Sequence, residues 1–121
     1  MPIRYRVDRG VLVLEVACKG FTEIRDALRA AVADPAARSK MPLLIDVRME
    51  VAGVRYEHIQ HRVEILSDMR RHFESRWAIV TGTETVPAGV GRVFAVFSEI
   101  EGLEAGLFAD KDEAIHWLTA P

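Results

Sequence analysis

The sequence predicts one α/β domain with a mostly parallel, five-stranded mixed sheet, an N-terminal hairpin and four helices. The first observation is that short apolar runs, typical of strands, alternate with longer amphipathic segments, typical of helices, in the order ββαβαβαβα. The second is the length of 121 residues, which suits a single domain over residues 1–121 with its own core. Strands separated by such helices are joined by right-handed crossovers and lie parallel.

The N-terminal segment alternates between apolar and charged residues, as an edge strand does. Ile3, Tyr5 and Val7 form its apolar side. A turn at residues 8–10 leads into the apolar run 11–17. Two extended runs joined by so short a turn indicate a hairpin.

The later elements are predicted from the period of their apolar residues and from their end signals. Nearly continuous apolar runs, suited to strands covered on both faces, are found at residues 42–48, 76–82 and 103–109. Amphipathic segments predict helices over residues 21–35, 55–73, 86–100 and 110–118. Pro35 ends the first of these helices, and Asp110 caps the N-terminus of the last.

The segment 86–100 is rich in apolar residues, and residues 93–97 are apolar throughout. We expect one side of this helix to pack on the sheet. That side comprises Val86, Val90, Val93, Phe94, Phe97 and Ile100. Core packing is the preferred interpretation, and an apolar pocket and a self-association face are the alternatives. Val96, if it lies outside the inward side, is exposed for a functional reason.

Composition weighs against several classes of function. Half of the residues are apolar and the net charge is −2, as in an ordinary soluble domain. The sixteen basic residues are interspersed with eighteen acidic ones, which disfavours a nucleic-acid surface. No apolar run approaches the roughly 18 residues of a transmembrane helix, so we expect no transmembrane segment and a cytoplasmic location. Cys18 is the single cysteine and is interpreted as a buried, inert thiol.

Three local patterns resemble the STAS fold and, more narrowly, its SpoIIAA-like group. They are "LLIDVR" at residues 43–48, "RWAIVTG" at residues 76–82 and the tail "EAGLFADKDEAIHWL" at residues 104–118. The resemblance covers roughly residues 4–118 and implies a STAS-like arrangement of the strands and helices.

In STAS proteins that antagonise anti-sigma factors, a strand ending in Asp is followed by a Ser or Thr that a partner kinase phosphorylates. Asp46 matches the strand-end acid, but residues 49–66 contain no Ser or Thr, so the hydroxyl-based switch is absent. Other SpoIIAA-like members are similar in outline to lipid-carrier domains of the CRAL-TRIO kind. By analogy of fold alone, the resemblance implies a small apolar ligand.

Asp46 follows a buried apolar strand, at the edge where open α/β sheets bind ligands. A carboxylate there needs partners, either backbone N–H groups of the next loop or a cation such as Arg48 or Arg55. Holding the loop at residues 49–55 is the preferred role, ahead of a ligand or metal contact. A catalytic base comes last, because no second group stands at a matching spacing.

Two further patterns are weaker. The glycine-rich segment 82–92 precedes and enters a helix and includes Arg92, but it matches no phosphate-binding pattern. We prefer to interpret it as a flexible connector, and an anion site is the alternative. A strip of metal-ligating residue types runs along the second helix at Glu57, His61, Glu64 and Asp68. We prefer to interpret it as a solvated surface, and a divalent-metal site is the alternative.

These observations predict a non-enzymatic SpoIIAA-like domain that binds a small apolar or anionic ligand. The expected ligand-binding residues are Asp46, Arg48, Tyr56, Gly82, Arg92, Phe94 and Phe97. No catalytic residue, cofactor or bound metal is expected. The alternatives are a regulatory protein-interaction module, which includes a homodimer, and an enzyme that uses Asp46 with an Arg and a helix N-terminus to stabilise an oxyanion.

Overall fold

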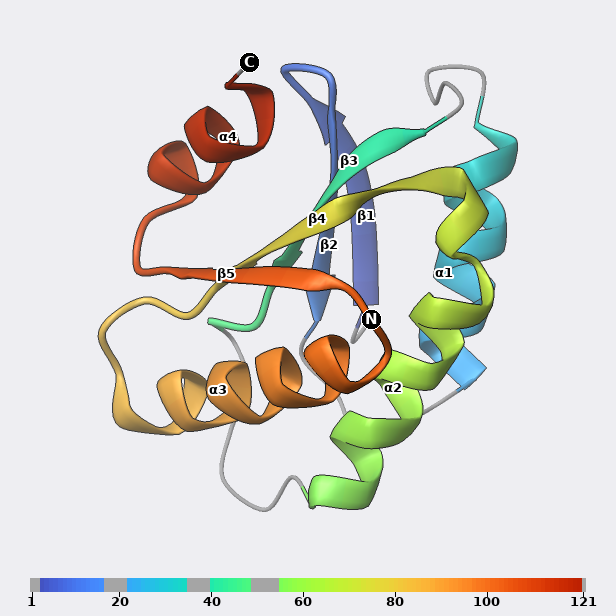
Figure 1. Ribbon diagram of the computed structural model, residues 1–121. Coiled ribbons are helices and arrows are strands. Elements are labelled where there is room, and N and C mark those ends of the chain that lie inside the picture. Colours follow the sequence, from blue (N-terminus) through green and yellow to red (C-terminus); the bar gives the residue numbers. More distant parts are fainter. Residues whose placement is uncertain (1–2, 17–21, 35–39, 49–54, 121) are drawn as a thin grey trace.

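A five-stranded mixed sheet lies at the centre of the computed structural model, which describes residues 3–16, 22–34, 40–48 and 55–120 (Figure 1). Its strands are β1 (Ile3–Asp8), β2 (Val11–Val16), β3 (Met41–Asp46), β4 (Phe73–Val80) and β5 (Glu104–Phe108). They lie in the order β1-β2-β3-β4-β5, with β1 antiparallel to β2 and the other neighbours parallel. The predicted mixed, mostly parallel sheet is confirmed.

Helices cover both faces of this sheet. Over the described residues they are α1 (Thr22–Ala33), α2 (Tyr56–Asp68), α3 (Thr85–Ile100) and α4 (Lys111–Thr119). The first three lie on one face and α4 lies on the other (Figure 1). No helix in the described part of the chain is long and apolar enough to cross a membrane.

The turn between β1 and β2 has the geometry that a tight hairpin needs. Arg9 and Gly10 both have positive φ, at 54° and 77°. Positive φ at both central residues is the signature of a type I′ turn, whose twist matches that of paired strands. Asp8 therefore faces Val11 across the hairpin, and the predicted hairpin is confirmed.

The strands alternate their side chains between two apolar cores, which explains their continuous apolar sequence. On the face covered by α1, α2 and α3, Leu12 and Leu43 pack with Trp77, whose indole N–H donates to the carbonyl of Glu74 at 3.1 Å. On the opposite face, a smaller core joins the strands to α4. It comprises Val11, Val13, Leu44, Ala78, Val80, Ala114, Ile115 and Leu118.

Polar contacts tie the start of α4 to the hairpin turn. The predicted N-cap Asp110 accepts a hydrogen bond from the backbone N–H of Asp112 at 2.7 Å. Lys111 Nζ lies 2.8 Å from Asp8 Oδ2, and Arg9 Nη2 lies 2.8 Å from Asp112 Oδ1. The hydrogen bond from Lys111 is the main reason that the pKa of Asp8 lies below its ordinary value.

The end of α2 differs from the sequence prediction, which extended this helix to Phe73. The helix ends at Asp68, and a short 3₁₀ turn over Arg70–His72 leads directly into β4. Phe73 has an extended backbone (φ −128°, ψ 160°), which places its buried side chain opposite Met41 in the sheet. Pairing in the sheet therefore overrides the helical spacing of this residue.

The orientation of α3 also differs from the prediction, although the helix itself is confirmed. Val86 and Ile100 were expected to face the sheet but are 39% and 71% exposed. The residues that are buried are Pro87, Val90, Gly91, Phe94, Ala95 and Ser98. A Cβ added to Gly91 would lie 2.2 Å from the Thr81 methyl carbon, so only glycine permits this close approach of helix and sheet.

Gly91→Ala tests this close contact. We expect it to lower the free energy of unfolding by about 1–2 kcal/mol, because overpacking outweighs the gain in helix propensity. Gly89→Ala is the matched control, since nothing lies within 4 Å of a Cβ at Gly89. The control should gain up to about 1 kcal/mol from propensity alone. Urea denaturation measures both, and equal gains in the two variants would contradict the packing argument.

Lys111→Met tests the contact between α4 and the hairpin. Because the folded-state pKa of Asp8 is lowered, its contribution to stability is present above the unfolded pKa and is lost as the pH falls through the folded pKa. The variant should raise the pKa of Asp8 towards its ordinary value, and Lys111→Arg should keep it low. Carboxyl ¹³C NMR titration measures the pKa of Asp8 in the wild type and in both variants. An unchanged pKa in Lys111→Met would refute the role of Lys111.

Candidate functional site

Asp46 lies at the carboxyl end of β3, and its carboxylate pairs with Arg48. Asp46 Oδ1 accepts from the backbone N–H and from Nε of Arg48, each at 3.0 Å. Asp46 Oδ2 accepts from Arg48 Nη2 at 2.7 Å. This two-pronged pairing is the strongest geometry that a carboxylate and a guanidinium form. The prediction that Asp46 needs Arg48 or backbone N–H groups as partners is confirmed.

Gly82, which follows the end of β4, completes this cluster. Its φ of +67° is a left-handed conformation that glycine adopts without strain. A Cβ at this position would lie 3.3 Å from Arg48 Cγ, so the aliphatic part of Arg48 packs over the glycine. Asp46, Arg48 and Gly82 are thus brought together at the carboxyl edge of the sheet, as predicted for the strand ends.

The charges around this cluster are mostly negative. The pKa of Arg48 is raised above its ordinary value, first by the hydrogen bond to Asp46 and further by the charges of Glu15 and Asp110. Three carboxylates, of which Asp46 is in direct contact, therefore stabilise the charge of this one guanidinium. An anionic ligand that approached Arg48 would meet more negative charge than positive. Both Asp46 oxygens are already used, which fits the structural role better than that of a base.

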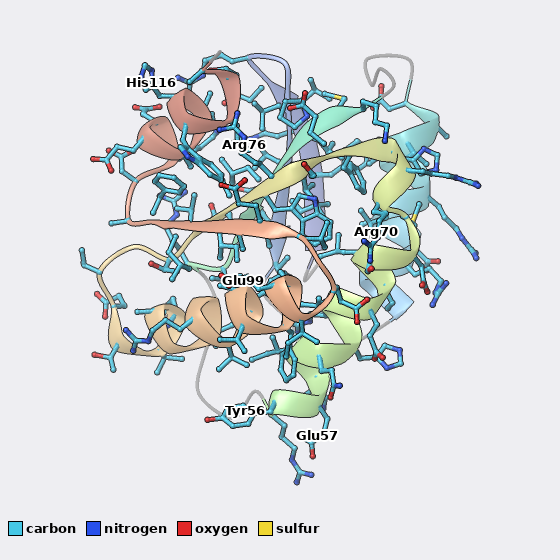
Figure 2. The ribbon with its side chains drawn as sticks, viewed as in Figure 1. Tyr56, Glu57, Arg70, Arg76, Glu99 and His116 are labelled. Carbon is cyan, nitrogen blue, oxygen red and sulfur yellow. The ribbon has the colours of Figure 1, made fainter. Side chains whose placement is uncertain are left out.

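The other four residues of the predicted ligand site lie elsewhere. Tyr56 is 69% exposed at the N-terminal end of α2, at the lower end of that helix in Figure 2. Phe94 is wholly buried in the core under α3. Arg92 is exposed on α3, and Phe97 is half-buried where α3 meets α2. The seven residues therefore do not line one site.

The weaker patterns find little support in the geometry. Over the described residues, no group of three or more His, Cys, Asp or Glu side chains is placed to hold a metal ion. His58 instead accepts a hydrogen bond from the backbone N–H of Arg55 at the start of α2. The residue before the first turn of α3 is the exposed Glu84, and its carboxylate disfavours an anion at that helix N-terminus. Cys18 lies outside the described residues.

Two hollows lined by described residues lie beside α3, one small and the other wide open to solvent. One of about 70 Å³ lies between α2 and α3 and includes Phe97 and Ile100 in its lining. That volume is far below the roughly 300–1,000 Å³ of small-molecule sites. The other, of about 490 Å³, is a depression at the C-terminal end of α3 that is lined by Glu99 and Glu104 together with small and apolar residues. Its volume falls within that range, but it is open to solvent and two carboxylates line it.

The side of α3 that faces away from the sheet carries a row of exposed and half-buried apolar residues, which we call the α3 stripe. It consists of Val86, Gly89, Val93, Val96 and Ile100. Val96 is 58% exposed and Ile100 is 71% exposed, while Val93 is half-buried. Residues spaced by three and four along a helix lie on one side, so these form a continuous strip. The exposure expected for Val96 is therefore part of a larger surface.

Sequence reasoning gave a self-association face on this helix only as an alternative, because it placed Val86, Val93 and Ile100 on the buried side. The small residues Gly91, Ala95 and Ser98 lie on one side of the helix, and that side can approach a sheet most closely. Their spacing could have predicted that the opposite side is exposed. Arg62 was also missed. It is wholly buried in α2, although its charge suggested an outer position.

Comparison of the chain with protein-family models, curated proteins and solved structures found no match. The candidate site is therefore judged on its own geometry. The geometry gives two candidate surfaces. One is the cluster of Asp46, Arg48 and Gly82 at the strand ends, and the other is the α3 stripe.

A double-mutant cycle tests the pairing of Asp46 with Arg48. We expect Asp46→Ala and Arg48→Ala to be less than additive, with a coupling of about 1 kcal/mol in the free energy of unfolding. This value is lower than for a buried pair because the Arg48 side chain is 43% exposed. The control cycle uses Asp46→Ala with Arg55→Ala and should show no coupling. Additive effects in the first cycle would refute a structural pair.

Proposed function

We propose that this chain is a non-enzymatic protein-interaction module of STAS-like fold that binds its partner through the α3 stripe. The observation that carries the proposal is the orientation of α3, which turns Gly91, Phe94 and Ala95 inward and leaves Val96 and Ile100 in solvent. Contiguous apolar surface of this kind marks interaction sites in soluble proteins.

The free energy available from burying the exposed apolar side chains of the stripe supports a binding role. Removing the exposed parts of Val96 and Ile100 from water contributes roughly 2–3 kcal/mol at the usual value for apolar surface. This gain requires a partner surface, because the sheet side of α3 is already filled by Phe94 and its neighbours. A helix with an apolar side of its own is the partner chemistry that suits such a strip.

A small-molecule function has weaker support. The α2–α3 hollow is small, Phe94 fills the space under α3, and three carboxylates already stabilise the charge of Arg48. The element order and the N-terminal hairpin support the STAS-like part of the proposal at the level of fold. Fold alone carries no function, so the interaction role stands on the α3 stripe.

The paired substitution Val96→Asp with Ile100→Asp tests the proposal. Both positions are exposed, so the variant should fold like the wild type by circular dichroism and thermal melting. Chemical cross-linking in native extract, followed by mass spectrometry, should recover a stoichiometric protein partner with the wild type and lose it with the variant. Asp introduces charges that an apolar contact excludes.

Tyr56→Asp is the control for this experiment, because Tyr56 is similarly exposed but belongs to α2 and is not part of the stripe. It should keep the partner. Recovery of the same partner by all three proteins would show that the α3 stripe is not the contact surface.

A further inference from the structure

The spacing of the central residues of the α3 stripe is the same in both directions along the helix. Gly89, Val93, Val96 and Ile100 are separated by four, three and four residues. Alternating spacings of three and four are those of helix-pairing seams. When a second α3 runs antiparallel, each residue of this set meets a residue of the same set.

We infer that the partner of the α3 stripe is a second copy of this chain, with the two α3 helices antiparallel about a two-fold axis. The inference rests on the proposed function and names its partner. In this register, Gly89 lies opposite Ile100 of the second copy, and Val93 lies opposite Val96 of the second copy. A two-fold axis makes every such contact occur twice.

The sizes of the paired residues are complementary. Ile100 is the largest and most exposed residue of the stripe, and Gly89 is the smallest. No neighbouring heavy atom lies within 4 Å of the position where Gly89 would carry a Cβ, so there is open space over the glycine. The isoleucine of one copy therefore fits over the glycine of the other, while the valines meet in the middle.

The charges beside the stripe are complementary in the same register. Arg92 and Glu99 are both exposed, and their separation of seven residues places them on one side of the helix. Figure 2 shows Glu99 on the side of α3 nearest β5. In the antiparallel pair, Arg92 lies within two residues, or about 3 Å along the axis, of the position facing Glu99 of the second copy. Both side chains are long enough to span that offset.

Other arrangements of the two helices lose this match. A parallel pair places Ile100 against Ile100, leaves a gap between the two glycines, and puts the Arg92 and Glu99 side chains of the two copies on opposite sides of the seam, where they do not meet. An antiparallel pair shifted to centre on Val93 brings the two Arg92 side chains together. Like charges held side by side oppose association, so the apolar spacing and the charge pattern together favour the register described above.

The contact is short, so the association is weak. From Gly89 to Ile100 the stripe rises about 16 Å, or three helical turns. An interface built on this length lies at the small end of specific protein contacts. We therefore expect a dimer whose population depends on protein concentration.

Sedimentation velocity of the full chain over a range of concentrations tests the inference with charge-swap variants. Arg92→Glu alone and Glu99→Arg alone should each weaken dimerisation about tenfold, because each places like charges together twice. The double variant, Arg92→Glu with Glu99→Arg, restores opposite charges and should restore dimerisation. Ile100→Asp should abolish it, and Tyr56→Asp should leave it unchanged.

The outcomes separate this inference from the proposed function. Rescue by the double variant supports the antiparallel register. A wild-type chain that stays monomeric at the highest concentration, or single charge variants that dimerise as the wild type does, overturns it. A wild-type chain that stays monomeric can still bind another protein that the variant Val96→Asp with Ile100→Asp does not bind. In that case the proposed interaction function is retained, and the partner is a different protein. If no partner depends on the stripe, both proposals fail.

Discussion

The close contact between Gly91 and Thr81 determines which side of α3 reaches solvent. Thr81 is fixed at the end of β4, because its backbone N–H donates to the carbonyl of Phe108 at 2.8 Å. A helix that meets this fixed point without a Cβ lies close to the sheet. Rotation of α3 to bury Val96 would bring a branched side chain where only a glycine fits. The exposed stripe is therefore a consequence of how the core is packed.

The pairing of Asp46 with Arg48 is a second constraint, and it acts over only two residues of sequence. A carboxylate at the end of a parallel strand stands where ligands and catalytic groups are often found. Here the same chain turn that ends β3 returns Arg48 to its own strand-end acid, and the Arg48 stem rests on Gly82. The strand-end acid of β3 is therefore paired with a cation of its own chain.

Much of the fold could be predicted from the sequence because each strand and helix has a clear apolar period. The hairpin, the parallel strands and the N-cap at Asp110 follow from local signals that the structure confirms. The end of α2 could not be predicted, since the seven-residue step from Leu66 to Phe73 suits either a continuing helix or a new strand. Only pairing with β3 decides between them.

The candidate site was harder to predict for a related reason. A pattern of apolar residues predicts the buried side of a helix by weighing hydrophobicity, whereas the distance between a helix and a sheet is set by side-chain volume. In α3 these two criteria point in different directions. Gly91, Ala95 and Ser98 satisfy the volume criterion, whereas the exposed Val86 and Val96 satisfy only the hydrophobic one. Residues chosen for a ligand site on chemistry alone, such as Phe94 and Arg92, consequently fall on different sides of the helix.

The composition of the α3 stripe is not explained by the stability of the isolated chain. Valine and isoleucine have lower helix propensity than alanine or leucine, and glycine costs about 1 kcal/mol relative to alanine at an exposed helical position. Nothing in the described structure packs on a Cβ position at Gly89, so packing within the chain does not require a glycine there. Solubility does not favour Val96 or Ile100 in solvent either. The proposed interaction surface accounts for Gly89, Val96 and Ile100, because apolar side chains are stabilised by burial in a contact and a glycine leaves room for a side chain of the partner.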